Sequence, residues 1–208
     1  ADNNFPQRDG RIIPLDPYKS YEEGKSQGID MLMGTNKDEC RYWIKEMGGL
    51  AIYFAGAPLL FENQIKKFNK KDADLARYFY RKSDAETVAW RLTDFENDLV
   101  FRVPCMKQLE LHAKNGGNSY HYYWTFPCSD PTIGACHAVE LSSVFNNLQE
   151  KIYTGDNVNR FLAGNVQKMW VNFAKTGNPS TNHIFWPKYT PEHKIVLWID
   201  ARITEKEN

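Results

Sequence analysis

Three short apolar runs along the chain have the length and composition of β-strands. Ile29–Gly34 is closed by a glycine, Ser119–Phe126 is dense in aromatic residues that favour strands, and Val196–Ile199 is the last of the three. The longest apolar stretch, Leu50–Phe61, is interrupted by glycine and proline, which favours a buried loop or a short helix. No run approaches the ~20 apolar residues that span a bilayer, so no membrane partner is expected.

Helical spacing of apolar residues fills the stretches between these runs. A Ser-x-x-Glu capping box at 83–86 predicts the start of a helix whose apolar face extends to Leu99. Pro104 is expected to interrupt this helix, and a second helix is predicted from there to about Lys114. Residues 5–20 carry three prolines and a glycine and are predicted to form an extended loop with local turns.

Two more helices are predicted in the second half of the chain. Apolar residues recur at helical spacing over Val139–Phe145 and over Phe161–Phe173, and Gly177 ends the latter. Strands separated by long helical stretches predict an α/β fold with few parallel strands and many helices. Three strands are few for 208 residues, so we expect a sheet that lacks some of its members. Because no repeat or Gly/Ser-rich linker divides the chain, residues 1–208 are predicted to form a single unit.

Composition and charge exclude several classes of function. Lys and Arg number 26, Asp and Glu number 26, the formal net charge is zero, and 14% of the residues are aromatic. The aromatic content predicts a folded chain, and the neutral charge gives no long-range attraction to phosphate backbones, so nucleic acid is not an expected partner. The four cysteines form no Cys-x-x-Cys pair and no usable N-glycosylation site occurs, which favours a cytoplasmic protein. Because the true N-terminus is not visible, a secreted protein stays the alternative.

Four side chains of the types that bind zinc are close together in the sequence, namely Cys128, Cys136, His121 and His137. Their uneven spacing matches none of the standard zinc patterns. No metal site is therefore predicted, and no motif indicates a cofactor.

The segment Gly24–Gly28 reads Gly-Lys-Ser-Gln-Gly and matches the nucleophile motif Gly-x-Ser-x-Gly. The chemistry of that motif requires a strand before the serine and a helix after it, so that a strained turn presents the hydroxyl. Here a polar, helical segment precedes the serine and an apolar strand follows it. We therefore interpret Ser26 as a chance match that lies on the polar surface, far from His137.

Two loops carry candidate catalytic side chains. Gly34-Thr35-Asn36-Lys37-Asp38-Glu39 ends the first predicted strand, where parallel sheets place their sites. Gly134–Leu141 contains His137 ahead of a predicted helix. Acidic loop residues are usually only solvated, and a single histidine is more often structural than catalytic, so neither loop is decisive by itself.

Together, in this order and about a hundred residues apart, the two segments resemble the type B carboxylesterase family, which includes the cholinesterases. The resemblance implies that Glu39 is the acid and His137 the base of a Ser-Glu-His triad. Glu140 matches an acidic position of the family and is expected beside the triad, although a charge in the first turn of a helix is the alternative. The segments Asp98–Pro104 and Trp170–Pro179 resemble the helix between acid and base and the C-terminal helix of the family.

The resemblance implies a carboxylic ester hydrolase that acts on a small uncharged ester through an acyl-enzyme. Cys40 departs from the family pattern, which usually has glycine there, and the family's nucleophile and oxyanion segments do not occur in this sequence. The chain thus resembles the C-terminal portion of an α/β-hydrolase fold whose sheet is completed by an N-terminal portion of the same enzyme. Alone, it is expected to be inactive and to self-associate through exposed edges of Ile29–Gly34 and Tyr120–Trp124. The alternative is a non-catalytic, cholinesterase-like interaction module.

Overall fold

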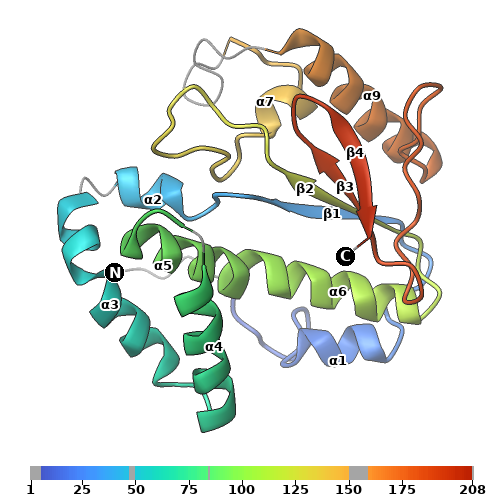
Figure 1. Cartoon of the computed structure of the whole chain (residues 1–208). Helices are drawn as coiled ribbons and strands as arrows, with labels where there is room; N and C mark the ends of the chain where they lie inside the picture. The colour runs from blue at the N-terminus through green and yellow to red at the C-terminus, as the bar shows by residue number, and fades with distance from the viewer. Residues whose placement is uncertain (1–5, 47–49, 84, 150–158, 208) are drawn as a thin grey trace.

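The structure is a computed structural model that describes residues 6–46, 50–83, 85–149 and 159–207. The described α-helices, which Figure 1 labels, are α1 (Pro17–Glu22), α2 (Arg41–Glu46), α3 (Leu50–Ile65), α4 (Lys70–Lys82), α5 (Val88–Asn97), α6 (Val103–Lys114), α7 (Leu141–Val144) and α9 (Arg160–Thr176). Between α5 and α6 lies the π-helical turn η1 (Asp98–Arg102). The strands are β1 (Met31–Asn36), β2 (Ser119–Trp124), β3 (Ile195–Ile199) and β4 (Ile203–Glu207). None of these helices is long and apolar enough to span a membrane.

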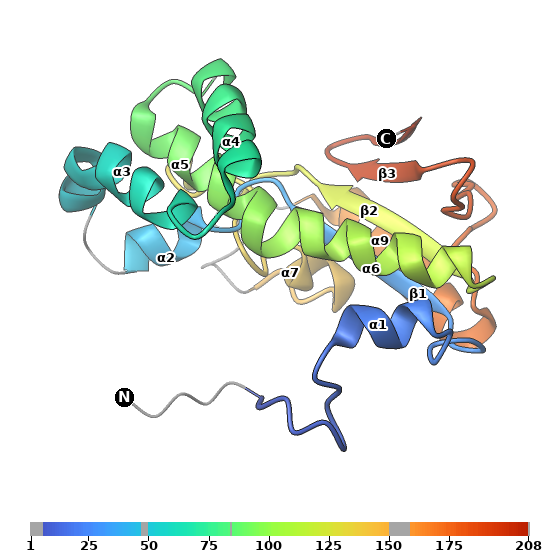
Figure 2. The ribbon, with the colours of Figure 1, turned by 90° about the horizontal axis from the view of Figure 1, so that it is seen from below.

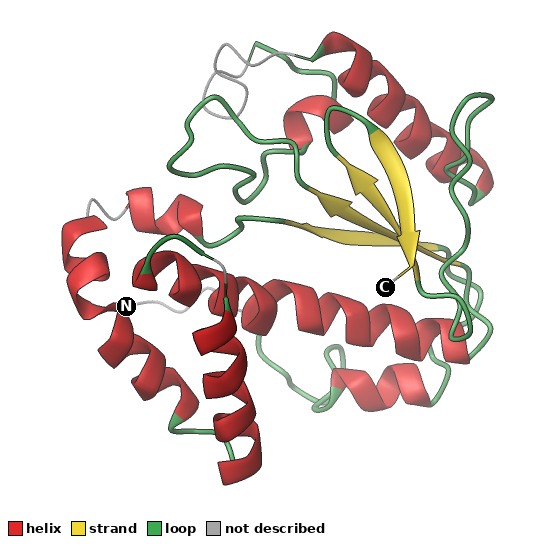
Figure 3. Cartoon of the chain, in the orientation of Figure 1, coloured by secondary structure: helices red, strands yellow, loops and turns green. Residues whose placement is uncertain are grey.

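The four strands form one sheet in the order β1-β2-β3-β4, with helices on both sides (Figure 3). The first three strands are parallel, and β4 runs antiparallel to β3. The α/β fold and the three predicted strands are confirmed, with shifts of one to two residues at their ends. β4 was not predicted because only Ile203 is half-buried and the rest of the strand is exposed, so no apolar pattern marks it.

The two outer strands of the sheet differ in chemistry. Within the described residues β1 has β2 as its single neighbour, and its sequence Met-Leu-Met-Gly-Thr-Asn carries no charge. β4 carries three charged residues, a pattern that discourages further strand pairing. The prediction that Tyr120–Trp124 exposes a pairing edge is wrong, because β2 is hydrogen-bonded to β1 on one side and β3 on the other.

Helices α6 and α9 cover opposite faces of the sheet (Figure 2). Successive side chains of a strand point to opposite faces, so β2 contributes Tyr120 and Trp124 to the α9 side. There they pack with Val166 and Met169 of α9, which are fully buried. On the other face, residues of α6 pack with Tyr189 and against the methionines of β1. The aromatic strand is therefore the centre of the core, as its composition predicts.

A separate apolar cluster joins α3 to α5, beside the sheet (Figures 1 and 3). Ala57, Phe61 and Ile65 of α3 are buried against Ala89 and Leu92 of α5. The stretch interpreted as a buried loop or short helix is thus part of a helix of 16 residues. Proline removes one helical hydrogen bond, and here the burial of this apolar face offsets that loss.

The helix predicted from the capping box begins later than expected. Thr87 is the N-cap of α5, and its hydroxyl accepts a hydrogen bond from the amide of Trp90. Ser83 instead ends α4, a helix that the prediction missed, and its backbone amide donates to the carbonyl of Phe79. The capping-box prediction was wrong because serine also terminates helices, and the local pattern does not distinguish the two ends.

Pro104 does not interrupt the helical path between α5 and α6. The wider turn η1 leads directly into α6, and the Val103 amide donates to the carbonyl of Asp98, five residues back. Pro104 follows in the first turn of α6, so the helical path accommodates a residue that has no amide hydrogen. In the second half of the chain α9 ends at Gly177 in the left-handed conformation, as predicted. The helix predicted over Val139–Phe145 is confined to the four residues of α7.

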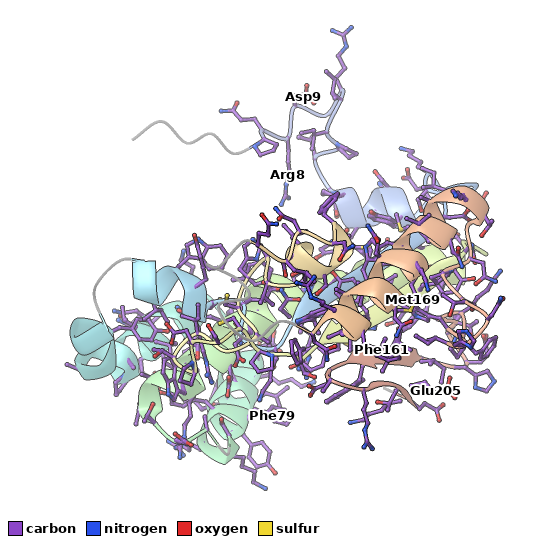
Figure 4. All side chains as sticks on the ribbon, turned by 90° about the horizontal axis from the view of Figure 1, so that it is seen from above. Arg8, Asp9, Phe79, Phe161, Met169 and Glu205 are labelled. Carbon is purple, nitrogen blue, oxygen red and sulfur yellow. The ribbon has the colours of Figure 1, made fainter. Side chains whose placement is uncertain are left out.

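The N-terminal segment is loop up to Asp16, which caps α1 by accepting hydrogen bonds from the amides of Tyr18 and Lys19. Arg8 and Asp9 lie on the part of this segment that extends away from the body of the molecule (Figure 4). The loop predicted for residues 5–20 is therefore correct only as far as Asp16, since Pro17 is the first residue of α1. Residue 5 lies outside the described part.

Candidate active site

The candidate acid lies in the turn that joins β1 to α2. Glu39 is buried, and its Oε1 accepts a hydrogen bond of 2.7 Å from the backbone amide of Asn36, the last residue of β1. The carboxylate is therefore folded back toward the end of its own strand. This is the edge of the sheet at which the sequence placed the candidate acid.

The candidate base lies in the loop between β2 and α7, and this loop is tied to the acid turn. The backbone groups of Asp38 and Ala135 are joined by a hydrogen bond of 2.9 Å, and the Ala135 amide donates to Asp38 Oδ2 at 2.9 Å. Gly134 has a φ of +55°, and a Cβ there would overlap the Asp38 carboxylate. A glycine at this position thus allows the two loops to come together.

The two candidate residues meet directly. His137 Nδ1 and Glu39 Oε2 are 2.7 Å apart, and the His137 amide also donates to the Glu39 carbonyl at 3.3 Å. The hydrogen bond to Glu39 raises the pKa of His137 above its ordinary value, although partial burial of the ring opposes this shift. The Glu39 side chain is 6% exposed, whereas that of His137 is 43% exposed. The pair therefore has a buried acid and an accessible imidazole.

Glu140 lies behind the pair and is linked to it through Asn36. The Asn36 side-chain amide donates to Glu140 Oε2 at 2.5 Å and to the Cys136 carbonyl at 2.9 Å. Burial raises the pKa of Glu140, and the hydrogen bond from Asn36 lowers it in part. Glu140 is the N-cap residue of α7 and directly precedes its first turn, which holds no acidic residue. Asn36 therefore links the two carboxylates, since its backbone amide donates a hydrogen bond to Glu39 and its side-chain amide donates one to Glu140.

Asn97 is a contributor that the sequence did not reveal. It is the last residue of α5, it is buried, and its Oδ1 accepts a hydrogen bond of 2.8 Å from the Cys40 amide. Its Nδ2 donates to the Lys37 carbonyl at 2.9 Å. One amide side chain thereby holds both ends of the acid turn. The available signal was a polar residue within an otherwise apolar helix face.

Two aromatic rings flank the imidazole and were also missed. Trp43 of α2 lies with its ring centroid 4.6 Å from that of His137, and Phe101 of η1 lies 5.4 Å from it. The two aromatic rings stack on each other at 5.7 Å. Nothing in the local pattern distinguished these residues from ordinary core positions. They limit the orientations that the His137 ring can adopt.

The structure corrects the expected position of Ser26. This serine is buried, and its Oγ lies 2.7 Å from Nδ1 of His112, whose Nε2 lies 2.9 Å from the Ile29 carbonyl. Gly24 and Gly28 adopt positive φ values, so the turn folds the serine inward instead of leaving it on the surface. Ser26 is thus bonded to a different histidine, and within the described residues no serine hydrogen-bonds to His137.

Cys40, which departs from the family pattern, is buried at the end of the acid turn. Burial raises the pKa of its thiol to about 12, so the side chain is neutral beside Glu39. The four cysteines form no disulfide. In the parts of the chain that the structure describes, no group of three metal-binding side chains comes together.

Comparisons with known proteins identify the family of this chain. The model of the carboxylesterase family matches residues 3–208. The chain is 31% identical to the para-nitrobenzyl esterase of Bacillus subtilis (strain 168), an alignment that covers 96% of this chain and 40% of that protein. It is 25% identical to acetylcholinesterase 1 of Caenorhabditis elegans, over 88% of this chain and 35% of that protein.

The fold is similar to solved structures of carboxylesterases. A PNB esterase structure superposes with a TM-score of 0.73 at 26% identity, covering 97% of this chain and 41% of that chain. A carboxylesterase of Geobacillus stearothermophilus superposes with a TM-score of 0.77 at 23% identity, covering 98% and 43%. The chain therefore spans about two fifths of the length of these relatives. It belongs to the carboxylesterase family, and its four-stranded sheet is part of the α/β-hydrolase fold.

Proposed function

We propose that this chain supplies the acid and the base of a Ser-Glu-His triad in a carboxylic ester hydrolase. Glu39 is the acid and His137 the base, whereas the nucleophilic serine and the oxyanion donors belong to an N-terminal portion of the same protein. The observation that carries this proposal is the contact of 2.7 Å between His137 Nδ1 and Glu39 Oε2, on two loops that are hydrogen-bonded to each other. The family to which the chain belongs supports the same reaction class.

The geometry fits the division of labour in such a triad. Because Nδ1 of His137 is bonded to Glu39, the outer Nε2 is left to receive the proton of a serine hydroxyl as that oxygen attacks the ester carbonyl. The same nitrogen then delivers the proton to the departing alcohol, and an acyl-enzyme forms. Water then gives a proton to Nε2 as its oxygen attacks the acyl carbonyl, and Nε2 returns that proton to the serine oxygen as the carboxylic acid leaves. Throughout, Glu39 stays ionised, holds the Nδ1–H tautomer and stabilises the imidazolium.

The free side of β1 supports an N-terminal portion as partner. This strand has an uncharged sequence and its second edge is unpaired within the described residues, whereas β4 at the other end is charged. An uncharged edge is suited to continuing a sheet. The isolated chain should accordingly self-associate through β1, and addition of the N-terminal portion should prevent this.

Activity measurements on the chain alone and joined to its N-terminal portion test the proposal. The chain alone should not hydrolyse a simple aryl ester, and the joined protein should hydrolyse it. His137→Ala should abolish that turnover, whereas His193→Ala, at an exposed histidine remote in sequence, should leave it unchanged. Sedimentation velocity of both forms reports the association state.

Two results would contradict the assignment. Turnover by the chain alone that disappears in His137→Ala would mean that these residues contain a nucleophile. A joined protein that is folded and monodisperse but hydrolyses no ester would favour the second candidate, a non-catalytic cholinesterase-like interaction module.

A further inference from the structure

A cavity that the triad does not use lies between the start of α6 and the facing side of β2 and β3. It has a volume of about 140 Å³ and is lined by Arg102, Met106, His121, Tyr123, Val196 and Trp198. Phe101 of η1 packs against His137, and the next residue, Arg102, lines the cavity. Arg102 and Tyr123 also line a neighbouring cavity with Asn36 and Lys37 of the acid turn, so this site adjoins the candidate active site without including Glu39 or His137.

The walls of this cavity suit a flat hydrocarbon group. The rings of Tyr123 and Trp198 meet edge to face with centroids 5.0 Å apart, and Val196 and Met106 complete the apolar surface. A cavity of about 150 Å³ with apolar walls accommodates benzene in another protein, so the volume here is sufficient for one aromatic ring. Shape and lining thus select a single small ring rather than a long chain.

Positive charge adjoins these apolar walls. The guanidinium carbon of Arg102 lies 5.4 Å from the ring centroid of Tyr123, and the Lys206 ammonium lies 3.4 Å from that of Trp198. Arg102 Nε pairs with Asp98 at 3.3 Å, which engages one edge of the guanidinium. A guanidinium has five N–H donors, so its remaining donors can bind a second carboxylate in the two-pronged geometry that arginine favours.

His121 adds a neutral polar side chain to the wall. The residue is 3% exposed, and burial, together with the charge of Arg102, lowers its pKa to about 4, so the ring is neutral at neutral pH. Among the residues that line the cavity, Arg102 is the charged one, and no carboxylate among them competes for an anion. The lining therefore favours a ligand that carries a negative charge beside its apolar part.

We propose that this cavity binds a small aromatic carboxylate. The ring lies against Tyr123 and Trp198, and the carboxylate is bound by Arg102. Neither Glu39 nor His137 lines the cavity, so its occupancy does not depend on whether the chain hydrolyses esters.

Benzoate and its uncharged isostere benzamide, titrated into the 208-residue chain by calorimetry and thermal shift, test this proposal. Benzoate should bind saturably and raise the melting temperature, and benzamide should bind at least about tenfold more weakly because it lacks the charge. Arg102→Gln should weaken benzoate about tenfold to a hundredfold, the loss expected for a charge-assisted hydrogen bond. Arg77→Gln, at an arginine that is ion-paired with Glu62 on another surface, should leave the affinity unchanged.

Three outcomes would overturn the proposal. They are the absence of saturable benzoate binding, equal affinities for benzoate and benzamide, and an Arg102→Gln variant that binds benzoate as the parent does. If Arg102→Gln does not fold, Arg102→Lys replaces it. That variant keeps the charge and loses the two-pronged geometry of the guanidinium, so it should weaken benzoate severalfold, and unchanged affinity would overturn the proposal in the same way.

Discussion

Replacement of Glu39 by glutamine should lower the pKa of His137. The substitution keeps the size of the side chain and removes the negative charge that lies 2.7 Å from Nδ1. Two unit charges with centres about 4 Å apart interact by about 4 kcal/mol at an effective dielectric constant of about 20. Because 43% of the His137 side chain is exposed, solvent screens the pair to well below that figure, and we expect the pKa to fall toward that of an unpaired histidine.

Glu39→Gln should also lower the free energy of unfolding, and the loss depends on pH. The folded-state pKa of His137 is raised, so the charged pair stabilises the native state fully at pH values below the unfolded-state pKa, which is near 6.5. That contribution is lost as pH rises through the folded-state pKa. Glu39→Gln should therefore reduce the free energy of unfolding more at about pH 5.5 than at about pH 9.

NMR titration of the histidine ring protons measures the pKa, with His137→Ala identifying the signal among the five histidines. Glu140→Gln should produce a smaller fall, since Glu140 acts on His137 through charge alone. Glu110→Gln, on the remote helix α6, should produce none. An unchanged His137 pKa in Glu39→Gln, or a fall equal to that in Glu140→Gln, would refute the argument that the direct hydrogen bond dominates.

Four other substitutions test the support around the pair. Gly134→Ala places a Cβ at a positive φ against the acid turn, and denaturant unfolding should reveal a loss of about 1–3 kcal/mol; an unchanged midpoint would contradict the close approach. Asn97→Leu leaves a buried N–H and a buried carbonyl unpartnered, so it should cost about 1–3 kcal/mol for each in the same assay, unlike Asn97→Asp, which keeps the acceptor. Ser26→Ala should cost about 1 kcal/mol without changing the pKa of His137, and a changed pKa would assign this serine to the active site. Trp43→Leu should lower that pKa, because an aromatic face attracts the imidazolium; an unaltered value in the NMR titration would contradict this contribution.

Local sequence determined much of the scaffold of this protein. The apolar runs gave β1, β2 and β3, because strands that helices cover on both faces carry mostly apolar and aromatic side chains. Gly177 ended α9 where predicted, since glycine enters the left-handed conformation without steric cost. The positions of the acid and histidine loops at strand ends followed from the same pattern. These features depend on neighbours in sequence, which a single chain displays directly.

Tertiary structure alone decided which distant residues meet. Glu39 and His137 are 98 positions apart, and their hydrogen bond depends on the parallel pairing of β1 with β2, which brings the ends of the two strands to one edge. The contributions of Asn97 and Trp43 depend on how α5 and α2 pack against those ends. Periodicity shows which side of an element is buried but not which element covers it, so no local pattern could have identified these contacts.

The same reason explains the errors. Ser26 was expected on the surface because its neighbours in sequence are polar, yet packing against α6 buries it beside His112. β4 carries no apolar alternation because one of its edges and most of its side chains face solvent, so only pairing with β3 defines it. The sequence shows which polar and apolar groups each segment carries. The three-dimensional packing selected which of those groups became partners, because hydrogen bonds and burial are made through space and not along the chain.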